Sequence, residues 1–419
     1  MKIKKINVES VAVILMCLYS IMMYAVYIDK SMESINTLVL YAFLGVSVLT
    51  LLCSRKTIKN NYLLWYSGFI LLAFIAALYA PETANSIKQI YTLLVVFGLT
   101  TAMSVVLTNK NRIELLMNCL VLGSVLLIVY LIATGKTDIN SETGDRLGNT
   151  LTGNANIFAC IFMVSACSSV YFLMAKPKIY QKAVYLIAFG FQMYALVLSG
   201  GRKYPLVPFL VWFFINLFKT DKRGKKHIFK YLIIGVSLLL VIYYLLINTP
   251  FLYEYIGHRF ESLVEYTLGL SQSTDASTAE RELMRQKAYE LWSESPLFGK
   301  GFSAFAQIGG FGVYSHCNYL ELLCNQGIIG FLYYYGFWGY LLFKIYALKR
   351  NSLIRLFLGA VLCGLLIYDY GAISYNTPIT HYFALMATLY IKDPEMFDDC
   401  QYGEMNIANC IAQEEGLDE

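Results

Sequence analysis

Twelve long apolar runs constrain the possible folds of this 419-residue chain more than any other feature of its sequence. A helix that crosses a bilayer needs about 20 mostly apolar residues, and the runs are of roughly that length. They are too long for ordinary strands and lack the alternation of apolar and polar residues that strands show. We therefore predict an all-α, polytopic membrane protein with about twelve transmembrane helices. The runs lie at about 11–28, 35–53, 62–80, 89–108, 113–133, 155–175, 182–199, 204–218, 231–248, 327–347, 352–370 and 377–391.

The composition also excludes a water-soluble protein. Hydrophobic residues make up 58% of the chain and charged residues only 15%, whereas soluble domains carry about 25% charge. The ten cysteines lie mostly inside apolar runs and show no metal-binding spacing, so we expect neither a zinc site nor a disulfide framework. The first apolar run is too long for the core of a cleaved signal, and we interpret it as the first transmembrane helix.

Loops rich in Lys and Arg alternate with loops that hold few. Under the positive-inside rule the basic loops are cytoplasmic, which places both termini there as well. Two long segments, 134–154 and 249–326, then lie on the other side, the second between the ninth and tenth helices. We expect a transmembrane domain over 1–392 and an acidic cytoplasmic tail over 393–419. The basic loops are 1–5, 55–59, 110–112, 176–182, 219–230 and 349–350.

The large loop over 249–326 contains one predicted helix, at 278–292. Ser277 and Thr278 can cap its start, and Ser295-Pro296 ends it. A loop this long and ordered is more often functional than a linker. Four apolar residues are spaced for one face of the helix: Leu283, Ala288, Leu291 and Trp292.

The first candidate site is the short turn Ser199-Gly-Gly-Arg202-Lys203. Its two cations break the charge rule that the other loops obey, and an unpaired cation near the bilayer boundary is costly. The glycines allow a ligand to approach the backbone, and arginine offers a planar fork that suits a phosphate or diphosphate. The alternative is a tight turn whose cations reach outer lipid headgroups.

The second candidate is His316, where the large loop returns to the membrane. Histidine can take a proton from a hydroxyl near neutral pH. Asn318 and Glu321 could orient it or contact ligand hydroxyls. The alternative is an interfacial histidine bonded to backbone. His258 beside Arg259 is a weaker copy, and His227 lies among cytoplasmic lysines.

The third candidate is a set of loop cations, Arg146, Arg281 and Arg285. Arg281 and Arg285 are four residues apart and therefore share a helix face. Together the three could clamp an anion. The alternative is pairing with neighbouring acids as ordinary surface charges, and these acids are Glu280, Glu282 and Glu290.

These residues, taken in order, resemble the O-antigen ligase and Wzy polysaccharide polymerase superfamily. Upstream, the resemblance includes the turn Ser199-Gly-Gly-Arg202 and the pair Arg146-Leu-Gly148 and Gly153-Asn-Ala-Asn156. Four departures from the family pattern concern sugar specificity more than class: Gly201 for Ser, Lys203 for a small residue, Gly153 for Pro, and Cys317 between His316 and Asn318. The sharpest match is the series Arg281, Trp292, Pro296-Leu-Phe-Gly299-Lys-Gly301-Phe302, His316-Cys-Asn318 and Gly327-Ile-Ile-Gly330.

The resemblance implies a GT-C-like membrane glycosyltransferase that uses neither a metal nor a cofactor. It would move glycan from an undecaprenyl-diphosphate carrier to an acceptor hydroxyl on the outer face of the cytoplasmic (inner) membrane. Arg202 would be catalytic, binding the donor diphosphate and stabilising its charge as it leaves, and His316 would be the general base. Arg146, Arg281, Arg285 and Lys203 would assist at the diphosphate, with Asn318 and Glu321 orienting the acceptor.

Three functions follow from these patterns. The first is a repeat-unit polymerase for a capsule, exopolysaccharide or O-antigen. The second is an O-antigen or teichuronic-type glycan ligase, which differs only in its acceptor. The third is a lipid-linked oligosaccharide transporter, which twelve helices would suit equally well, although transporter sites lie nearer the midplane. Expected partners are the lipid-linked oligosaccharide, membrane lipids, a flippase and a chain-length regulator, with no nucleic acid.

Overall fold

All regular structure in the described residues of the chain is helical. The computed structural model describes residues 7–54, 60–137, 146–151, 154–220, 228–268, 270, 276–348 and 350–397. His227, Gly153 and most of the predicted tail over 393–419 lie outside these ranges. The twelve long helices are α1 (Val8–Ala25), α2 (Ser31–Ser54), α3 (Asn61–Ala77), α4 (Thr83–Val106), α5 (Lys110–Ala133), α6 (Ala155–Ala175), α7 (Ile179–Leu198), α8 (Lys203–Phe218), α9 (Ile228–Asn248), α14 (Asn318–Ala347), α15 (Leu353–Asp369) and α16 (Pro378–Lys392).

Each of the twelve predicted apolar runs falls in one of these helices. Eight helices in the described ranges are long and apolar enough to cross a membrane. Two shorter apolar helices, α3 and α8, add to them. The prediction of a polytopic helical membrane protein is therefore confirmed, while the count of twelve spans and their orientation stay predictions.

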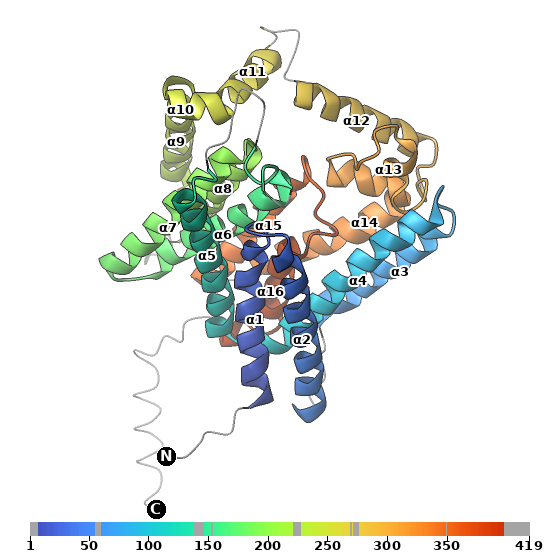
Figure 1. Cartoon of the computed structure of the whole chain (residues 1–419), viewed down its shortest axis with the longest axis horizontal. Coiled ribbons are helices and arrows are strands. Elements are labelled where there is room, and N and C mark those ends of the chain that lie inside the picture. The colour runs from blue at the N-terminus through green and yellow to red at the C-terminus, as the bar shows by residue number, and fades with distance from the viewer. Residues whose placement is uncertain are drawn as a thin grey trace, which may run out of the picture.

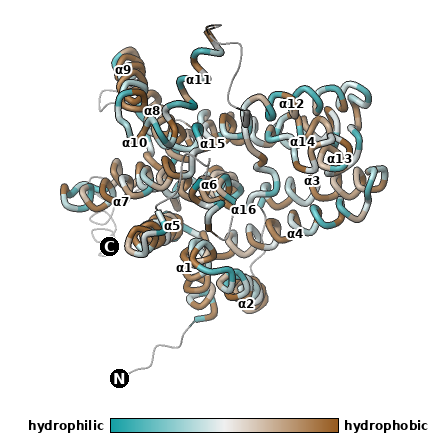
Figure 2. The backbone as a smooth tube through the Cα atoms, turned by 45° about the horizontal axis from the view of Figure 1, so that its top comes forward, coloured by the Kyte–Doolittle hydropathy of each residue, from teal (hydrophilic) through white to brown (hydrophobic). Residues whose placement is uncertain are grey.

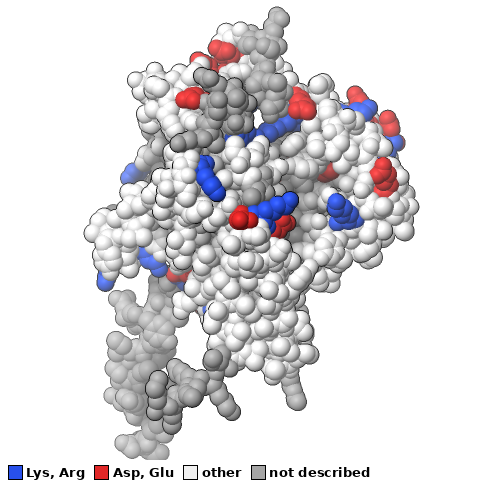
Figure 3. Space-filling model, viewed as in Figure 1, with Lys and Arg blue, Asp and Glu red and all other residues white. Residues whose placement is uncertain are grey.

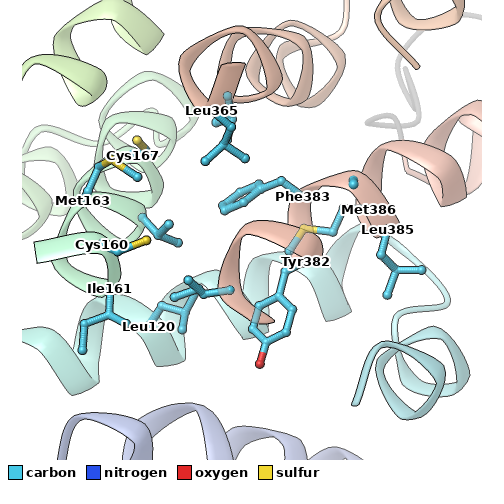
Figure 4. Close-up of a cluster of buried hydrophobic side chains, with 14 of the residues drawn as sticks. Leu120, Cys160, Ile161, Met163, Cys167, Leu365, Tyr382, Phe383, Leu385 and Met386 are labelled. Atoms are coloured by element: carbon cyan, nitrogen blue, oxygen red, sulfur yellow. The ribbon is translucent and has the colours of Figure 1, made fainter. Parts of the chain in front are cut away.

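The centre of the bundle is built from α5, α6, α15 and α16. Most residues of α6 are buried, and Figure 4 shows Cys160 and Met163 of this helix in one cluster with Leu365 of α15 and Phe383 of α16, while Ile161 lies on the side of Leu120 of α5. By contrast, α9 buries only Gly235 and Leu246, and it is hydrophobic along much of its length in Figure 2. An apolar helix with so little buried surface needs an apolar surrounding, which lipid supplies.

Helix α14 is broken at Gly327, where φ is 65° and ψ is −165°. The break leaves carbonyls without helical partners, and the glycine-rich loop satisfies them. The backbone N–H of Lys300 donates to the Cys324 carbonyl (2.7 Å) and that of Gly301 to the Asn325 carbonyl (3.1 Å). A Cβ on Gly327 would lie 2.3 Å from the Leu297 backbone. The loop at Lys300 and Gly301 and the helix break at Gly327 thus form one structural unit.

The other helices gather at one end of the bundle, above α6, α8 and α15 in Figure 1. The predicted helix at 278–292 is confirmed as α12, and its buried face is Met284, Ala288 and Leu291, packed on Phe305. The placement of Leu283 on that face was wrong, because Leu283 is 57% exposed. The helices at this end are α10 (Pro250–Leu252), the π-helical turn η2 (Tyr253–Gly257), α11 (His258–Thr267), α12 (Ala276–Ser293) and α13 (Ala304–Ile308).

Candidate functional site

The turn between α7 and α8 holds two guanidinium groups against its backbone. Arg146 donates from Nε to the Ser199 carbonyl (2.6 Å), and Arg259 donates to the Gly200 carbonyl (3.0 Å). Gly200 has a φ of 64°, which glycine adopts without strain. A Cβ there would lie 3.1 Å from Arg259 and 3.3 Å from Arg146. The glycine therefore lets two cations approach the same turn.

Arg202, just before α8, connects three helices. Its guanidinium donates to the Arg259 carbonyl of α11 (2.8 Å) and to the Thr278 hydroxyl of α12 (2.7 Å). The sequence interpretation expected Thr278 to cap α12, whereas its hydroxyl accepts from Arg202. Arg259 was missed as a site residue. The available signal was its position beside His258 in the large loop, but His258 itself bonds the Tyr253 carbonyl (3.0 Å).

Arg281 and Arg285 of α12 differ in what they contact. Arg285 pairs with Glu282, and its guanidinium lies 5.2 Å from the centre of the Tyr370 ring. Arg281 has no hydrogen bond or ion pair to any residue that the structure describes. It borders a cavity of about 300 Å³, which we call the Arg281 cavity, together with Asn156, Tyr314 and His316. Arg281 is therefore the one of the two that is available to a ligand.

Arg146 completes a group of four arginines with Arg202, Arg259 and Arg281. Burial, and then the charge of Arg259, lower the pKa of Arg146 to about 10, so it remains protonated at neutral pH. Its Nη2 also donates to the Asn156 amide oxygen (3.3 Å). In Figure 3, Lys and Arg atoms are visible in the hollow between the two upper lobes, while the surface over α1 and α2 below is largely uncharged. The arginine group thus concentrates positive charge at one end of an apolar protein.

Lys203 is turned toward α15 rather than toward this arginine group. Its ammonium lies 4.3 Å from the centre of the Tyr368 ring and 3.4 Å from the Tyr368 carbonyl. The ring of Tyr204 is 5.1 Å away. These cation–π contacts and the carbonyl satisfy the ammonium within the protein.

His316 lies in the loop before α14 with a φ of 56°. A non-glycine residue in this region is uncommon and is found disproportionately at functional sites. Its ring packs on Tyr314 at 4.5 Å between centres. Burial, followed by the charges of Arg281, Lys203 and Arg146, lowers the pKa of His316 to about 4. The imidazole is therefore neutral at physiological pH, which is the form a general base requires.

Asn318 and Glu321 are buried and hold the segment around His316. The Asn318 amide oxygen accepts from the backbone N–H of Ser374 (3.1 Å), and its nitrogen donates to the Tyr335 hydroxyl (2.8 Å). The Glu321 carboxylate accepts from the Ser315 backbone N–H (2.8 Å). These bonds fix the backbone next to His316, while the orienting role of the two residues and their contact with an acceptor stay predictions.

An apolar groove of about 280 Å³ leads to Arg202 from between α7, α8, α9 and the α10–α11 segment. Arg202 is the only charged residue among the described residues that line it. The stacked rings of Tyr194 and Phe251, 5.9 Å apart, form part of its wall. A guanidinium at the end of an apolar groove suits an amphiphile whose anionic head follows an apolar tail.

Residues 183–335 match the family model described as O-antigen ligase. The matched segment extends from α7 into α14 and contains Arg202, Arg259, Arg281 and His316. None of the curated proteins matches the chain. The family match confirms the resemblance that the ordered motifs predicted.

Proposed function

We propose, because residues 183–335 belong to the O-antigen ligase family, that this chain is a membrane glycosyltransferase that polymerises glycan repeat units. The donor would be an oligosaccharide on undecaprenyl diphosphate, and the acceptor a hydroxyl of a second lipid-linked oligosaccharide. The observation that carries the proposal is a set of three features at one end of the bundle. Arg202 lines an apolar groove, its guanidinium bonds the Arg259 carbonyl within the arginine group, and His316 borders the Arg281 cavity.

The donor would bind with its lipid tail in the groove and its diphosphate among the arginines. Arg202 and Arg281 would contact the diphosphate, because arginine binds phosphate oxygens through paired N–H groups. Arg146 and Arg259 would bring further positive charge while holding the turn at Ser199 and Gly200. In this arrangement Arg285 supports α12 through Glu282, and Lys203 supports the contact between α8 and α15.

The transfer step needs one base and a stabilised leaving group. The neutral His316 imidazole takes the proton of the acceptor hydroxyl as its oxygen attacks the anomeric carbon of the donor sugar. A new C–O bond forms, and the bond between that carbon and the diphosphate breaks. The diphosphate leaves with the electron pair, and the guanidinium groups of Arg202 and Arg281 stabilise the charge that develops on it.

The site would face the outside of the cytoplasmic membrane, with twelve spans and both termini in the cytoplasm. The alternation of basic loops supports this orientation, because it places α10–α13 and the arginine group on the non-cytoplasmic side. Cations near the bilayer boundary on that side are costly unless an anion pairs with them, and an anionic, membrane-carried donor would be that anion. A flippase that delivers the donor and a regulator of chain length would be the natural protein partners.

Two other functions compete with polymerisation. A ligase of the same family would use the same donor site and a different terminal acceptor, and a transporter would move the lipid-linked oligosaccharide without breaking a bond. Purified protein in proteoliposomes, given lipid-linked repeat units, separates them. A ladder of products supports the polymerase, and a single transfer to an added terminal acceptor supports the ligase. Movement of intact donor without release of undecaprenyl diphosphate would support the transporter.

A further inference from the structure

A second cavity adjoins the Arg281 cavity at His316 and extends away from the arginine group. We call it the Gln89 cavity, and its volume is about 350 Å³. The two cavities share Asn156, Val313, Tyr314 and His316. The Gln89 cavity then continues to α4, at Gln89, and to the loop between α15 and α16, at Asn376. A volume this size is at the small end of ligand pockets, and it fits the end of a glycan rather than a whole repeat unit.

The polar side chains on this wall include three amide or hydroxyl groups without a hydrogen-bond partner in the described part of the chain. They are Gln89, Ser303 and Asn376, and all three border the Gln89 cavity. Gln89 and Asn376 are partly buried, and Ser303 is 7% exposed. Side chains in such positions can donate to and accept from water or a ligand. Two carboxamides and a hydroxyl that border one small cavity therefore offer a set of donors and acceptors that a ligand can use.

Backbone strain marks the same cavity. Ser303 and His316 are the two non-glycine residues with positive φ among the described residues, at 64° and 56°. Both border the Gln89 cavity and lie in the segment between α12 and α14. Such strain persists where the surrounding structure enforces it, often at ligand sites.

The charge of the cavity contrasts with that of its neighbour. None of the described residues that line it is Lys or Arg, and its one acidic residue is Glu321. Lys203 lies against the Tyr204 and Tyr368 rings and is not part of the lining. Among the lining residues an anionic sugar would find the Glu321 carboxylate and no ammonium or guanidinium group, whereas an uncharged sugar would find aromatic rings, carboxamides and hydroxyls.

We infer that the Gln89 cavity is the acceptor subsite and that it takes the uncharged terminal sugar of the acceptor glycan, a neutral hexose or N-acetylhexosamine. This rests on the proposed function, because His316 links the subsite to the donor diphosphate. The rings of Tyr314, Tyr368 and Tyr375 border the sugar, and Gln89, Ser303 and Asn376 hydrogen-bond its hydroxyl or acetamido groups. The attacking hydroxyl then points to the shared wall, at His316.

The test uses the whole protein in proteoliposomes with lipid-linked donor and acceptors joined through a non-hydrolysable phosphonate, which cannot act as donors. Acceptors that differ only in their terminal sugar, as hexose, N-acetylhexosamine or hexuronate, are compared. We expect the hexuronate acceptor to react at least tenfold more slowly than the better uncharged acceptor. We expect Gln89→Leu to raise the acceptor KM about tenfold, the effect of one lost hydrogen bond, with unchanged affinity for undecaprenyl diphosphate. Lys88→Leu, an exposed neighbour on α4, is the matched control and should change neither value.

Unchanged acceptor KM in Gln89→Leu, or faster transfer to the hexuronate acceptor, would overturn this inference and leave the proposed function standing. A wild-type protein that transfers no glycan would overturn the proposed function, and the subsite with it. Binding of undecaprenyl diphosphate, measured on the same preparations, reports whether each variant is folded. Asn376→Leu gives a second test in a different element of the cavity wall.

Discussion

Arg202 and Arg259 are joined by a hydrogen bond of 2.8 Å from the guanidinium of the first to the backbone carbonyl of the second. The guanidinium of Arg259 returns to the same turn, at the Gly200 carbonyl (3.0 Å). Residues 57 positions apart thus bring two positive charges to one backbone segment. Two positive charges on one backbone segment favour an anion bound beside them, and a diphosphate would be such an anion.

We predict that glycosyl transfer needs the planar guanidinium of Arg202 with its paired N–H groups, and not only its positive charge. Arg202→Lys keeps the charge and loses the paired N–H groups that reach Thr278 and the Arg259 carbonyl. We expect kcat to fall on the order of 10²-fold, the usual cost of losing one stabilising donor in a transition state. Release of undecaprenyl diphosphate from labelled donor measures it. Wild-type rates in the lysine variant would show that simple charge attraction suffices.

Arg281 and Arg285 provide a matched pair on one helix. Arg281 borders the Arg281 cavity without an internal partner among described residues, and Arg285 is held by Glu282 and Tyr370. We expect Arg281→Ala to weaken the binding of undecaprenyl diphosphate at least tenfold, because it removes charge-assisted hydrogen bonds to the phosphate. We expect Arg285→Ala to change this affinity less than threefold. Titration of both variants in nanodiscs measures the affinities. The reverse order would show that the donor contacts Arg285 and not Arg281.

The pH dependence of transfer should report His316. Its pKa is lowered to about 4, so the free enzyme holds a neutral base at every pH above that value and loses it as the pH falls through 4. We expect kcat/KM to decline only below about pH 4 to 5 on the acid side. Among the neighbouring charges, that of Arg281 lowers this pKa most. Arg281→Ala should therefore raise the pKa of His316 and move the acid limb of kcat/KM to higher pH. If the acid limb does not move, the group that titrates there is not His316.

Asn318 should matter for stability because four hydrogen bonds converge on its side chain. Its oxygen accepts from Ser374 and Tyr375, and its nitrogen donates to Tyr335 and Asp369. Asn318→Ala leaves buried groups unsatisfied, at a cost on the order of 1–3 kcal/mol for each. We expect a clearly lower thermal midpoint in detergent than for the exposed control Asn85→Ala. An unchanged midpoint would show that water or a shift of the 371–377 loop replaces the bonds.

Sequence patterns predicted the fold well where local physics determines it. The apolar runs predicted all twelve long helices, because length and hydropathy are properties of each segment alone. The motif series predicted Arg202, Arg281 and His316 as site residues, and the structure brings them to one end of the bundle. The buried face of α12 was predicted less well, since Met284 and not Leu283 is buried. Only the packing of α12 on α14 determines which of these two adjacent residues is buried.

The rest of the site depends on contacts between distant segments. Arg259 meets the turn at Gly200, and Gln89 meets Asn376 across a cavity that α4 and the 371–377 loop enclose only after folding. Neither periodicity nor spacing in the sequence predicts contacts between such distant segments. Neither residue stands out in the sequence, because Gln89 lies in an apolar helix and Arg259 lies in a stretch of mixed charge beside a histidine. Strain at Ser303 is likewise visible only in the backbone.

The decisive measurement is the fate of the donor in proteoliposomes that contain only the purified protein, lipid-linked repeat units and lipid. The wild-type protein should release undecaprenyl diphosphate and form longer lipid-linked glycan in equal amounts. Arg202→Ala and His316→Ala, present at the wild-type level, should do neither. Intact donor that crosses the bilayer with no diphosphate released, or full activity in both variants, would contradict glycosyl transfer at this site.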